Sequence, residues 1–325
     1  MKPVGIIGLG EYLPKRVLTN RDLEKMVDTT DEWITTRTGI KERRLVSENE
    51  ATSDLAINSA KEALKDAKLE PKDLDLIIVA TVTPDMQFPS VSCLVQKALG
   101  AKKAACFDIS AACAGFIYGI VTAQQFILSG LYKNILVIGA EVLSSITDWQ
   151  DRSTCVLFGD GAGAVVVSKV KRGGILSTYL GSNGDMADLL LVPGGGSRNP
   201  ASHQTIDKRM HYIKMRGNEL FKYAVICMTE AVKIALKRAK LTTRDIDCLI
   251  PHQANLRIIQ AVAKRLNLDE KKVYLNIHKY GNISSASTAT ALCEAVKEKV
   301  IKRGDIVVLD AFGAGLVWGA CVIEW

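Results

Sequence analysis

Residues 106–131 read CFDISAACAGFIYGIVTAQQFILSGL, and this stretch decides how the chain is organised. CFDIS is typical of a short strand, and the small side chains of AACAG allow a tight passage from that strand into a helix. No charged residue occurs from Ile109 to Tyr132, so the predicted helix has no face suited to solvent. We therefore expect a helix that is buried on all sides.

Cys113 falls in the first turn of this predicted helix. Unpaired backbone N–H groups and the positive end of the helix dipole favour a thiolate there, and they lower a cysteine pKa below its free value of about 8.5. The position therefore predicts a reactive thiol. Free cysteine is also among the commonest core residues, so the position alone leaves a purely structural role open.

The composition is that of an ordinary globular protein. With 325 residues and 48% hydrophobic composition, the chain can bury a large core and form two domains or one large two-part unit. The apolar run near the N-terminus is broken by glycine and proline and is too short for a signal-peptide core, so we expect a cytoplasmic protein. The 106–131 segment contains glutamine and serine and lacks a flanking aromatic belt, which argues against a membrane span.

Cysteine content and charge argue against several classes of site. The eight cysteines form no CxxC pair and no metal spacing with the four histidines, which predicts reduced thiols and neither a disulfide frame nor a metal site. The net charge of +7 suits a solvated surface, an acidic partner or a phosphate-bearing ligand. Nucleic-acid binding is not expected, because the basic residues are not interleaved with aromatic ones.

Two glycine-rich segments fail to match nucleotide-binding motifs. GIIGLG (5–10) lacks the GxGxxG order, and Pro14 stands where a phosphate-binding helix would begin, so this segment is predicted to be a strand. GDGAGA (159–164) is followed by no GK[ST], and we interpret it as a tight turn that leads into a strand.

The second half of the chain repeats the first. ALKDAKLEPKDLDLII (63–78) and ALKRAKLTTRDIDCLI (235–250) are identical at nine of sixteen positions, and NILVIGAE (134–141) matches DIVVLDAF (305–312) at nearly the same offset. The chain is therefore interpreted as a duplicated α/β unit.

The repeat also predicts how the layers stack. The helix that begins at Cys113 corresponds to one that begins after GNISSAS (281–287), whose start is likewise small and uncharged. Two related units would place these helices side by side between two sheets, with amphipathic helices such as residues 52–68 outside. The glycine-rich residues 192–202 are expected to form a loop or lid.

Two polar residues of the second half stand at the carboxyl ends of predicted strands. His252 follows DCLIP, and Asn282 lies just before the second central helix. Ligands gather at such strand ends in α/β sheets, and the twofold relation of the halves brings these ends together. We therefore expect Cys113, His252 and Asn282 to converge on one pocket, although His252 alone is more typical of a core residue and Asn282 alone of a cap.

The polar segment TDEWITTRTGIKERR (30–44) holds a tryptophan among arginines. Trp33 beside Arg37 can stack on a flat ring and bind phosphates. A surface segment with ordinary salt bridges has the same pattern, so the sequence alone leaves both interpretations open.

Six motifs carry a resemblance that covers essentially the whole chain. They are the 30–44 segment, DISAACAGF (108–116), DRSTCVLFGDGAGAVV (151–166), PHQANLRI (251–258), YGNISSAS (280–287) and DAFGAGLVWGA (310–320). In these motifs the chain resembles the β-ketoacyl-acyl carrier protein synthase III family of the thiolase superfamily.

The resemblance implies both a fold and a reaction. The fold would be a thiolase-like duplicated α/β unit of five αβαβα layers with two central buried helices. The internal repeat places the join near residues 169–174, so residues 1–172 and 173–325 are predicted to be the two halves. The reaction would be the decarboxylative condensation of a short acyl-CoA, expected to be acetyl-CoA, with malonyl-acyl carrier protein. The enzyme would be a homodimer that needs no metal or redox cofactor.

The resemblance also implies roles for particular residues. The family's Cys–His–Asn set falls on Cys113, His252 and Asn282, whereas elongating synthases of the superfamily use Cys–His–His. Coenzyme A would be held by Trp33, Arg37, Arg152, Gly217 and Asn255. The backbone N–H groups of Cys113 and Gly313 are expected to bind the oxyanion of the tetrahedral intermediates.

Two further surfaces are predicted. In LRIIQAVAKRL (256–266) an apolar stripe leaves three basic residues outward, which would dock an acidic carrier protein or simply be solvated: Arg257, Lys264 and Arg265. Phe88 lies in TPDMQFPSVS (83–92), whose prolines predict an irregular loop. In the family the matching loop closes the acyl pocket of the dimer partner, so Phe88 would limit primer length or serve as an interface anchor.

Two other functions stay open at this point. A related condensing enzyme would make a polyketide, quinolone or hydroxymethylglutaryl product. A catalytically silent binding subunit would share the fold, but the presence of all three polar residues argues against it.

Overall fold

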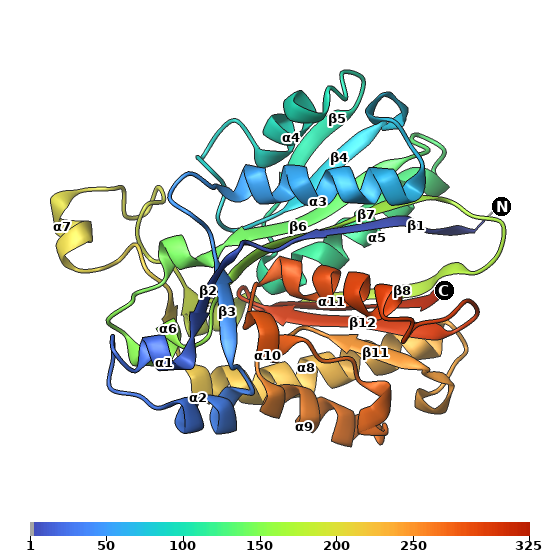
Figure 1. Cartoon of the computed structure of the whole chain (residues 1–325). Helices are drawn as coiled ribbons and strands as arrows, with labels where there is room; N and C mark the ends of the chain where they lie inside the picture. Colours follow the sequence, from blue (N-terminus) through green and yellow to red (C-terminus); the bar gives the residue numbers. More distant parts are fainter. Residues whose placement is uncertain (1–2) are drawn as a thin grey trace.

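The computed structural model describes residues 3–325, which stack as five layers of helices and sheets (Figure 1). Two mixed sheets enclose two central helices, α5 (Gly115–Leu128) and α11 (Ser285–Lys297). Longer helices cover the outer faces of the sheets: α3 (Thr52–Ala67) and α4 (Val91–Leu99) on one side, α8 (Gly217–Arg238) and α9 (Leu256–Leu266) on the other. This is the five-layer arrangement that the sequence predicts.

Each half of the chain supplies one sheet. The first consists of β1 (Val4–Tyr12), β4 (Leu76–Ala80), β5 (Ala105–Ile109), β6 (Ile135–Val142) and β7 (Asp160–Lys169) in the order β1-β7-β6-β4-β5. The second consists of β8 (Gly174–Ser182), β11 (Cys248–Pro251), β12 (Ile306–Gly313) and β13 (Val317–Glu324) in the order β8-β13-β12-β11.

The two sheets share one pattern of strand directions. In the first, β4 is parallel to β5 and β6, and β7 is antiparallel to β1 and β6. In the second, β11 is parallel to β12, and β13 is antiparallel to β8 and β12. In place of a strand equivalent to β5, the second sheet has an isolated parallel bridge between Leu249 and Val273. The duplication read from the sequence is thus visible in the topology.

The repeated sequence segments also adopt the same local structure. Each covers the end of an outer helix, a short 3₁₀ turn and a buried strand: α3, Pro71–Asp73 and β4 in the first half, and α8, Thr243–Asp245 and β11 in the second. In each turn an aspartate accepts the backbone N–H three residues earlier, at 3.0 Å for Asp73 and 2.7 Å for Asp245. The same side-chain cap therefore starts both turns.

Glycines let α11 approach the first sheet closely. A Cβ on Gly163 of β7 would lie 2.5 Å from the Cβ of Ala289, and one on Gly139 of β6 would lie 2.5 Å from the carbonyl oxygen of Ser285. The prediction of a tight turn at residues 159–164 was wrong, because Gly161 and Gly163 lie inside β7. Glycine serves close packing here, and the sequence pattern does not distinguish that use from a turn.

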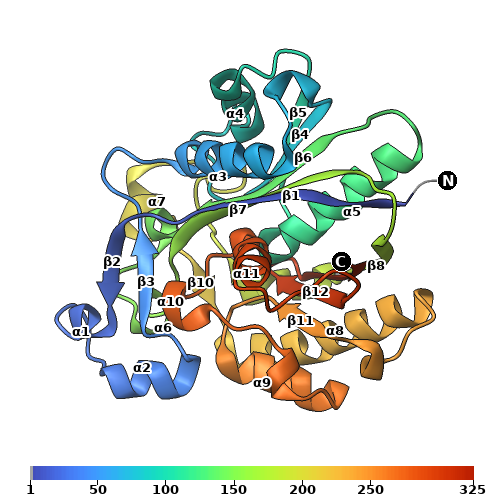
Figure 2. The same cartoon turned by 45° about the vertical axis from the view of Figure 1, so that its right-hand side comes forward.

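Helix α5 is less buried than its sequence predicts. Its first half is enclosed, with Phe116, Ile117 and Ile120 inaccessible to solvent. Gln125 and Leu128 near its end are exposed, so the expectation of burial on all sides was wrong for this half. The helix packs against the first sheet, including its edge strand β5, and Figure 2 shows α5 and α11 in the layer between the two sheets.

Short helices and strands surround the carboxyl ends of the parallel strands, on the left of Figure 1. They are β2 (Arg16–Thr19), α1 (Asn20–Leu23), α2 (Asp31–Thr38), β3 (Glu42–Leu45), α6 (Arg152–Cys155), β9 (Leu190–Leu191), α7 (His203–Asp207), β10 (Lys214–Met215) and α10 (Ile277–Tyr280). Strands β2 and β3 form one antiparallel pair, and β9 and β10 form another. Residues 192–202 form the expected loop.

Over residues 3–325, none of the helices combines the length and apolarity needed to cross a bilayer. The same residues include no cluster of three histidine, cysteine, aspartate or glutamate side chains that could hold a metal ion.

Candidate active site

A cavity of about 820 Å³ opens between the two halves, at the carboxyl ends of the sheets. Segments far apart in the sequence supply its walls. Cys113, His252 and Asn282 all line it, together with Gly313 at the end of β12. The three polar residues therefore converge on one cavity, as their positions at strand ends and the twofold relation of the halves predicted.

Cys113 lies in a 3₁₀ turn, Ala112–Ala114, between β5 and α5. Ala112 has φ 42°, a backbone conformation that projects the following residue sharply from the strand end. The thiol is buried, and this burial raises the pKa of Cys113 to about 12. The expectation of a lowered pKa was wrong, because desolvation of the thiolate outweighs the helix dipole in an enclosed site and α5 begins only at Gly115.

His252 follows the last residue of β11, and its backbone N–H donates to the carbonyl oxygen of Asp310 at 2.7 Å. Burial lowers the pKa of the imidazole to about 3, so the ring is neutral at physiological pH. Its Nδ1 atom has no hydrogen-bond partner among the described residues. A neutral histidine in this place can donate one hydrogen bond to a bound molecule.

Asn282 lies between α10 and α11, and its backbone is held by Leu157 and Gly159 at 2.9 and 3.0 Å. Its side-chain oxygen Oδ1 accepts the backbone N–H of Ser284 at 2.9 Å. Because the oxygen is engaged, the NH₂ group of the carboxamide is the part left to donate to a bound molecule. His252 and Asn282 thus form a pair of neutral donors in one cavity.

Gly313 packs directly against the nucleophile turn. A Cβ at this position would lie 2.6 Å from the backbone nitrogen of Cys113, so only glycine allows this approach. The backbone of β12 therefore runs beside the N–H of Cys113 at the cavity wall, which is the contact that the predicted oxyanion pair requires.

Trp33 lies at the mouth of the cavity. The guanidinium carbons of Arg37 and Arg152 lie 5.7 and 4.8 Å from the centre of its ring. Arg152 also donates to the carbonyl oxygen of Asp28 at 2.7 Å. The half-buried ring with two exposed cations can stack on a flat heterocycle and bind phosphates.

Asn255 and Gly217 stand where helices begin beside the mouth. Asn255 caps α9 by accepting the N–H of Arg257 at 2.9 Å, and its NH₂ group donates to the carbonyl oxygen of Arg37 at 3.1 Å. Gly217 starts α8 and lines the cavity. Of the coenzyme A residues that the resemblance implies, all but Arg152 line the cavity, and Arg152 reaches it through Trp33.

The 30–44 segment is organised by an arginine that sequence reasoning missed. Arg43 is fully buried and donates to the carbonyl oxygens of Leu18 and Val156 and to the side chain of Asn20, at 3.2, 2.8 and 2.9 Å. Desolvation lowers its pKa to about 10. Nothing in the sequence distinguished Arg43 from the other arginines of this segment, because its partners lie in two other segments, residues 18–20 and Val156.

Sequence reasoning also missed the apolar wall of the cavity. It comes from the turn after β6, the segment before β7 and the β9–β10 pair, and includes Leu143, Ile146, Phe158, Leu190, Ile213 and Met215. No local pattern marks these residues. Ser284, which lines the cavity next to Asn282, did have a signal in the hydroxyl-rich GNISSAS motif.

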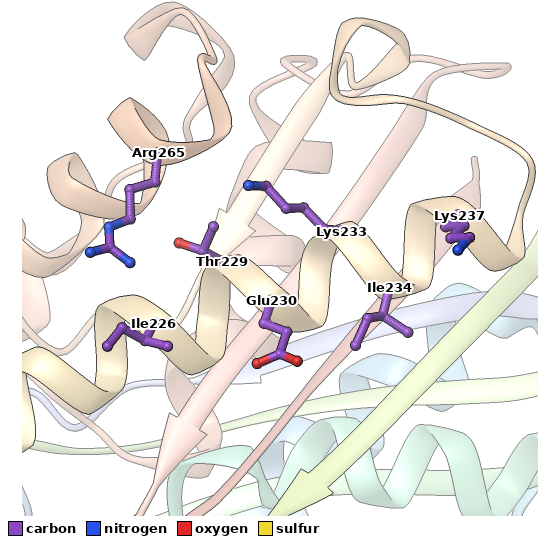
Figure 3. A pocket seen from close by; sticks show the side chains of 7 residues that line it. All are labelled: Ile226, Thr229, Glu230, Lys233, Ile234, Lys237 and Arg265. Atoms are coloured by element: carbon purple, nitrogen blue, oxygen red, sulfur yellow. The ribbon is translucent and has the colours of Figure 1, made fainter.

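The remaining predicted residues lie outside the inner cavity. Phe88 is 83% exposed, in the loop before α4, and does not line the cavity of its own chain. Arg257 is at the cavity mouth, while Lys264 and Arg265 are exposed farther along α9. Figure 3 shows Arg265 pointing over α8, beside a shallow hollow of about 340 Å³ that Lys233 also lines.

The chain matches two family models. Residues 107–184 match 3-oxoacyl-[acyl-carrier-protein (ACP)] synthase III, and residues 236–325 match the C-terminal model of the same family. The first match contains Cys113, and the second contains His252 and Asn282.

Relatives extend the match to the whole chain. Beta-ketoacyl-[acyl-carrier-protein] synthase III of Caldanaerobacter subterraneus subsp. tengcongensis is 61% identical over 99% of this chain and 97% of its own. The Clostridioides difficile protein of the same name is 57% identical, over 99% and 98%. The crystal structure of 3-oxoacyl-[acyl-carrier-protein] synthase III from Aquifex aeolicus, 53% identical, superposes with a TM-score of 0.93 over 99% of this chain and 100% of that one. The chain therefore belongs to the β-ketoacyl-acyl carrier protein synthase III family of the thiolase superfamily.

Proposed function

We propose that this protein condenses an acyl-CoA with malonyl-acyl carrier protein to give a β-ketoacyl-acyl carrier protein, carbon dioxide and coenzyme A. The observation that carries the proposal is the convergence of Cys113, His252 and Asn282 in one cavity, whose mouth holds a tryptophan close to two arginines. A thiol can carry the acyl group, and two neutral donors can stabilise an enolate.

The first half-reaction transfers the acyl group to the enzyme. The sulfur of Cys113 attacks the thioester carbonyl, and the backbone N–H groups of Cys113 and Gly313 bind the oxyanion that forms. The bond between the carbonyl carbon and the sulfur of coenzyme A then breaks. The stacking and charge at the mouth hold the nucleotide while this occurs.

The second half-reaction makes the carbon–carbon bond. Malonyl thioester loses carbon dioxide, and the resulting enolate oxygen accepts hydrogen bonds from neutral His252 and from the NH₂ group of Asn282. The carbanion attacks the acyl-Cys113 thioester, and Cys113 leaves as a thiolate. A neutral imidazole suits this task, because the imidazole has a proton to donate without carrying a charge into a buried site.

The primer is proposed to be acetyl-CoA, with Phe88 limiting longer chains across a homodimer. Phe88 and Met86 are exposed by 83% and 47% in the loop before α4, and β5 is an edge strand of the first sheet, paired only with β4 among residues 3–325. A second copy that covers this edge would bury both side chains. The same contact would let Phe88 reach the partner's acyl pocket.

Three further assignments belong to the proposal. The basic residues Arg257, Lys264 and Arg265 on α9 would dock the acidic carrier protein. Residues 1–172 and 173–325 would be the two halves, since one sheet ends at Lys169 and the other begins at Gly174. The protein would act in the cytoplasm, where both substrates of such a reaction are found.

Intact-mass spectrometry after incubation with acetyl-CoA tests the first half-reaction. We expect one added acetyl group, located on the peptide that contains Cys113, and none in Cys113→Ala. Acylation and condensation by Cys113→Ala would contradict the mechanism. Product analysis with malonyl-acyl carrier protein then separates a β-ketoacyl product from the polyketide, quinolone or hydroxymethylglutaryl alternatives.

A chain-length profile tests the role of Phe88. Phe88→Thr should extend primer use by several carbons and keep acetyl-CoA activity, because each methylene that finds room contributes about 0.8 kcal/mol and one that meets a fixed ring is rejected. An unchanged profile together with a weaker dimer would leave Phe88 as an interface anchor only.

A further inference from the structure

A buried glutamate joins two segments that border the active-site cavity. Glu141, near the end of β6, is inaccessible to solvent and has no part in the reaction described above. Gly139 lies two residues earlier on the same face of the strand, and a Cβ there would be 2.5 Å from the carbonyl oxygen of Ser285. This face of β6 therefore meets the start of α11, and a carboxyl group placed this deep is costly unless its neighbours use it.

One oxygen of Glu141 holds the chain just after β4. Its Oε2 accepts the backbone N–H of Val82 at 3.0 Å and the hydroxyls of Thr81 and Thr83 at 3.2 and 2.8 Å. The Thr83 hydroxyl also accepts the N–H of Val142 at 2.8 Å, so this segment is tied to β6 at several points. Val82 lines the cavity, and the exposed loop before α4 follows directly. The placement of both depends on these contacts.

The other oxygen of Glu141 contacts the first residue of α11. Oε1 lies 3.1 Å from the hydroxyl of Ser285, and that hydroxyl donates to the carbonyl oxygen of Ala80 at 2.8 Å. Ser285 directly follows Ser284, whose φ of 48° is a conformation that a non-glycine residue keeps only where the surrounding structure holds it. Asn282 belongs to the same turn, so the Ser285 contact helps to fix where its NH₂ group lies.

These contacts fit a neutral carboxylic acid. Burial raises the pKa of Glu141, which favours the protonated form. The Ser285 hydroxyl has one proton, and when that proton is donated to Ala80 its lone pairs can accept the proton on Oε1. Oε2 keeps its role as an acceptor, so both oxygens are used, as a buried polar group requires. A glutamine side chain offers the same arrangement, with its NH₂ group in place of the protonated oxygen.

We propose that Glu141 is a positioning residue that joins the segment after β4 to the start of α11, and so sets both the placement of Asn282 and the selection of the primer. This rests on the proposed condensation, in which Asn282 donates to the enolate and Phe88 limits primer length. Through Ser285, Glu141 fixes the turn that holds Asn282. Through residues 81–83 it fixes the cavity wall at that segment and the base of the loop that carries Phe88. Displacements below 1 Å at either place alter reaction rates.

Four variants and one control test the two contacts separately. Glu141→Leu removes the hydrogen bonds at similar size, whereas Glu141→Gln keeps them. Ser285→Ala removes the contact to α11, and Thr83→Val removes a contact to the segment after β4. Thr290→Val is the control, because its buried hydroxyl lies in α11 and donates within that helix, to the carbonyl oxygen of Ser287 at 3.1 Å. Thermal unfolding of each protein reports its stability.

Three rates are compared in each protein: acetyl transfer to the enzyme, malonyl thioester decarboxylation, and transfer of butyryl relative to acetyl groups. Ser285→Ala should lower decarboxylation roughly tenfold relative to acetyl transfer and keep the primer preference, because a displaced donor stabilises the enolate less well. Thr83→Val should reduce the preference for acetyl-CoA over butyryl-CoA roughly tenfold and keep the decarboxylation rate. Glu141→Leu should show both changes, and Glu141→Gln should rescue both. Thr290→Val should show neither.

Several outcomes would overturn the positioning role. The defects of Glu141→Leu in Glu141→Gln would mean that Glu141 acts through its charge and not as a bridge. Equal loss of all three rates in Glu141→Leu, together with a lower unfolding temperature, would leave a structural role alone. If Glu141→Leu does not fold, Ser285→Ala and Thr83→Val decide. A wild-type protein that takes no acetyl group would refute the proposed function itself, whereas wild-type behaviour of Ser285→Ala and Thr83→Val would refute only the role of Glu141.

Discussion

At the mouth of the cavity two exposed guanidinium groups lie close to the ring of Trp33, whereas at the inner end Cys113, His252 and Glu141 are buried. Burial shifts all three inner pKa values toward the neutral form: upward for the thiol and the carboxyl, downward for the imidazole. Water at the mouth lets charges persist there. The mouth is therefore suited to binding by charge and stacking, and the inner end to chemistry by neutral hydrogen-bond donors.

Substitutions at the inner end of the cavity should have the largest effect on activity. His252→Ala or Asn282→Ala should lower malonyl thioester decarboxylation roughly 100-fold to 1000-fold, because each removes one donor to the enolate, worth about 3 kcal/mol in comparable sites. Acetyl transfer to Cys113 should remain measurable. Both half-reactions are followed separately, by carbon dioxide release and by intact mass.

Equal loss in both half-reactions would break this division of labour. It would mean that the replaced residue also takes part in acyl transfer. Ser287→Ala serves as the control for disturbance at the start of α11, where the Ser287 hydroxyl accepts the N–H of Ile283 at 3.1 Å.

The inner end also marks the limit of what the sequence could predict. The apolar 106–131 segment, the internal repeat and the strand-end positions of His252 and Asn282 were sufficient to predict the five layers and the convergence of three polar residues. These features are encoded locally, in hydrophobic periodicity and small residues. The direction of the Cys113 pKa shift could not be predicted in this way, because it depends on how completely other segments enclose the thiol.

Other errors have the same origin. The GDGAGA segment has the composition of a turn, and only the position of α11 shows that its glycines make room for Ala289. In the sequence Arg43 is indistinguishable from a surface arginine. The structure shows that it is buried and donates to Leu18, Asn20 and Val156. The role of each of these residues depends on contacts between segments that are distant in the sequence. Such contacts could not be predicted from the single sequence.

An intermediate effect is expected at the mouth. Trp33→Ala should raise KM for acetyl-CoA about tenfold and leave kcat nearly unchanged, because stacking of a base on an aromatic ring contributes about 1–3 kcal/mol. Acetyl-pantetheine, which lacks the nucleotide, is the matched control substrate and should show no change. An equal rise in KM for both substrates would indicate that Trp33 mainly supports the packing of α2, where it contacts the cluster around Ile34.

The smallest effect should come from the charges on α9. Arg257→Glu should raise KM for malonyl-acyl carrier protein roughly fivefold, and added salt should reduce the difference between the variant and the wild type, because exposed charge pairs are weak and screened. Since Arg257 also lines the mouth, malonyl-CoA alone is an incomplete control. Lys264→Glu, outside the cavity, should affect only the carrier substrate. Arg244→Glu makes the same charge change before β11, at the opposite end of that strand from His252, and should alter neither KM. The basic face of α9 would be only a solvated surface if Arg257→Glu, Lys264→Glu and Arg244→Glu changed KM for the carrier substrate equally. Equal changes in KM for both substrates in Lys264→Glu would lead to the same conclusion.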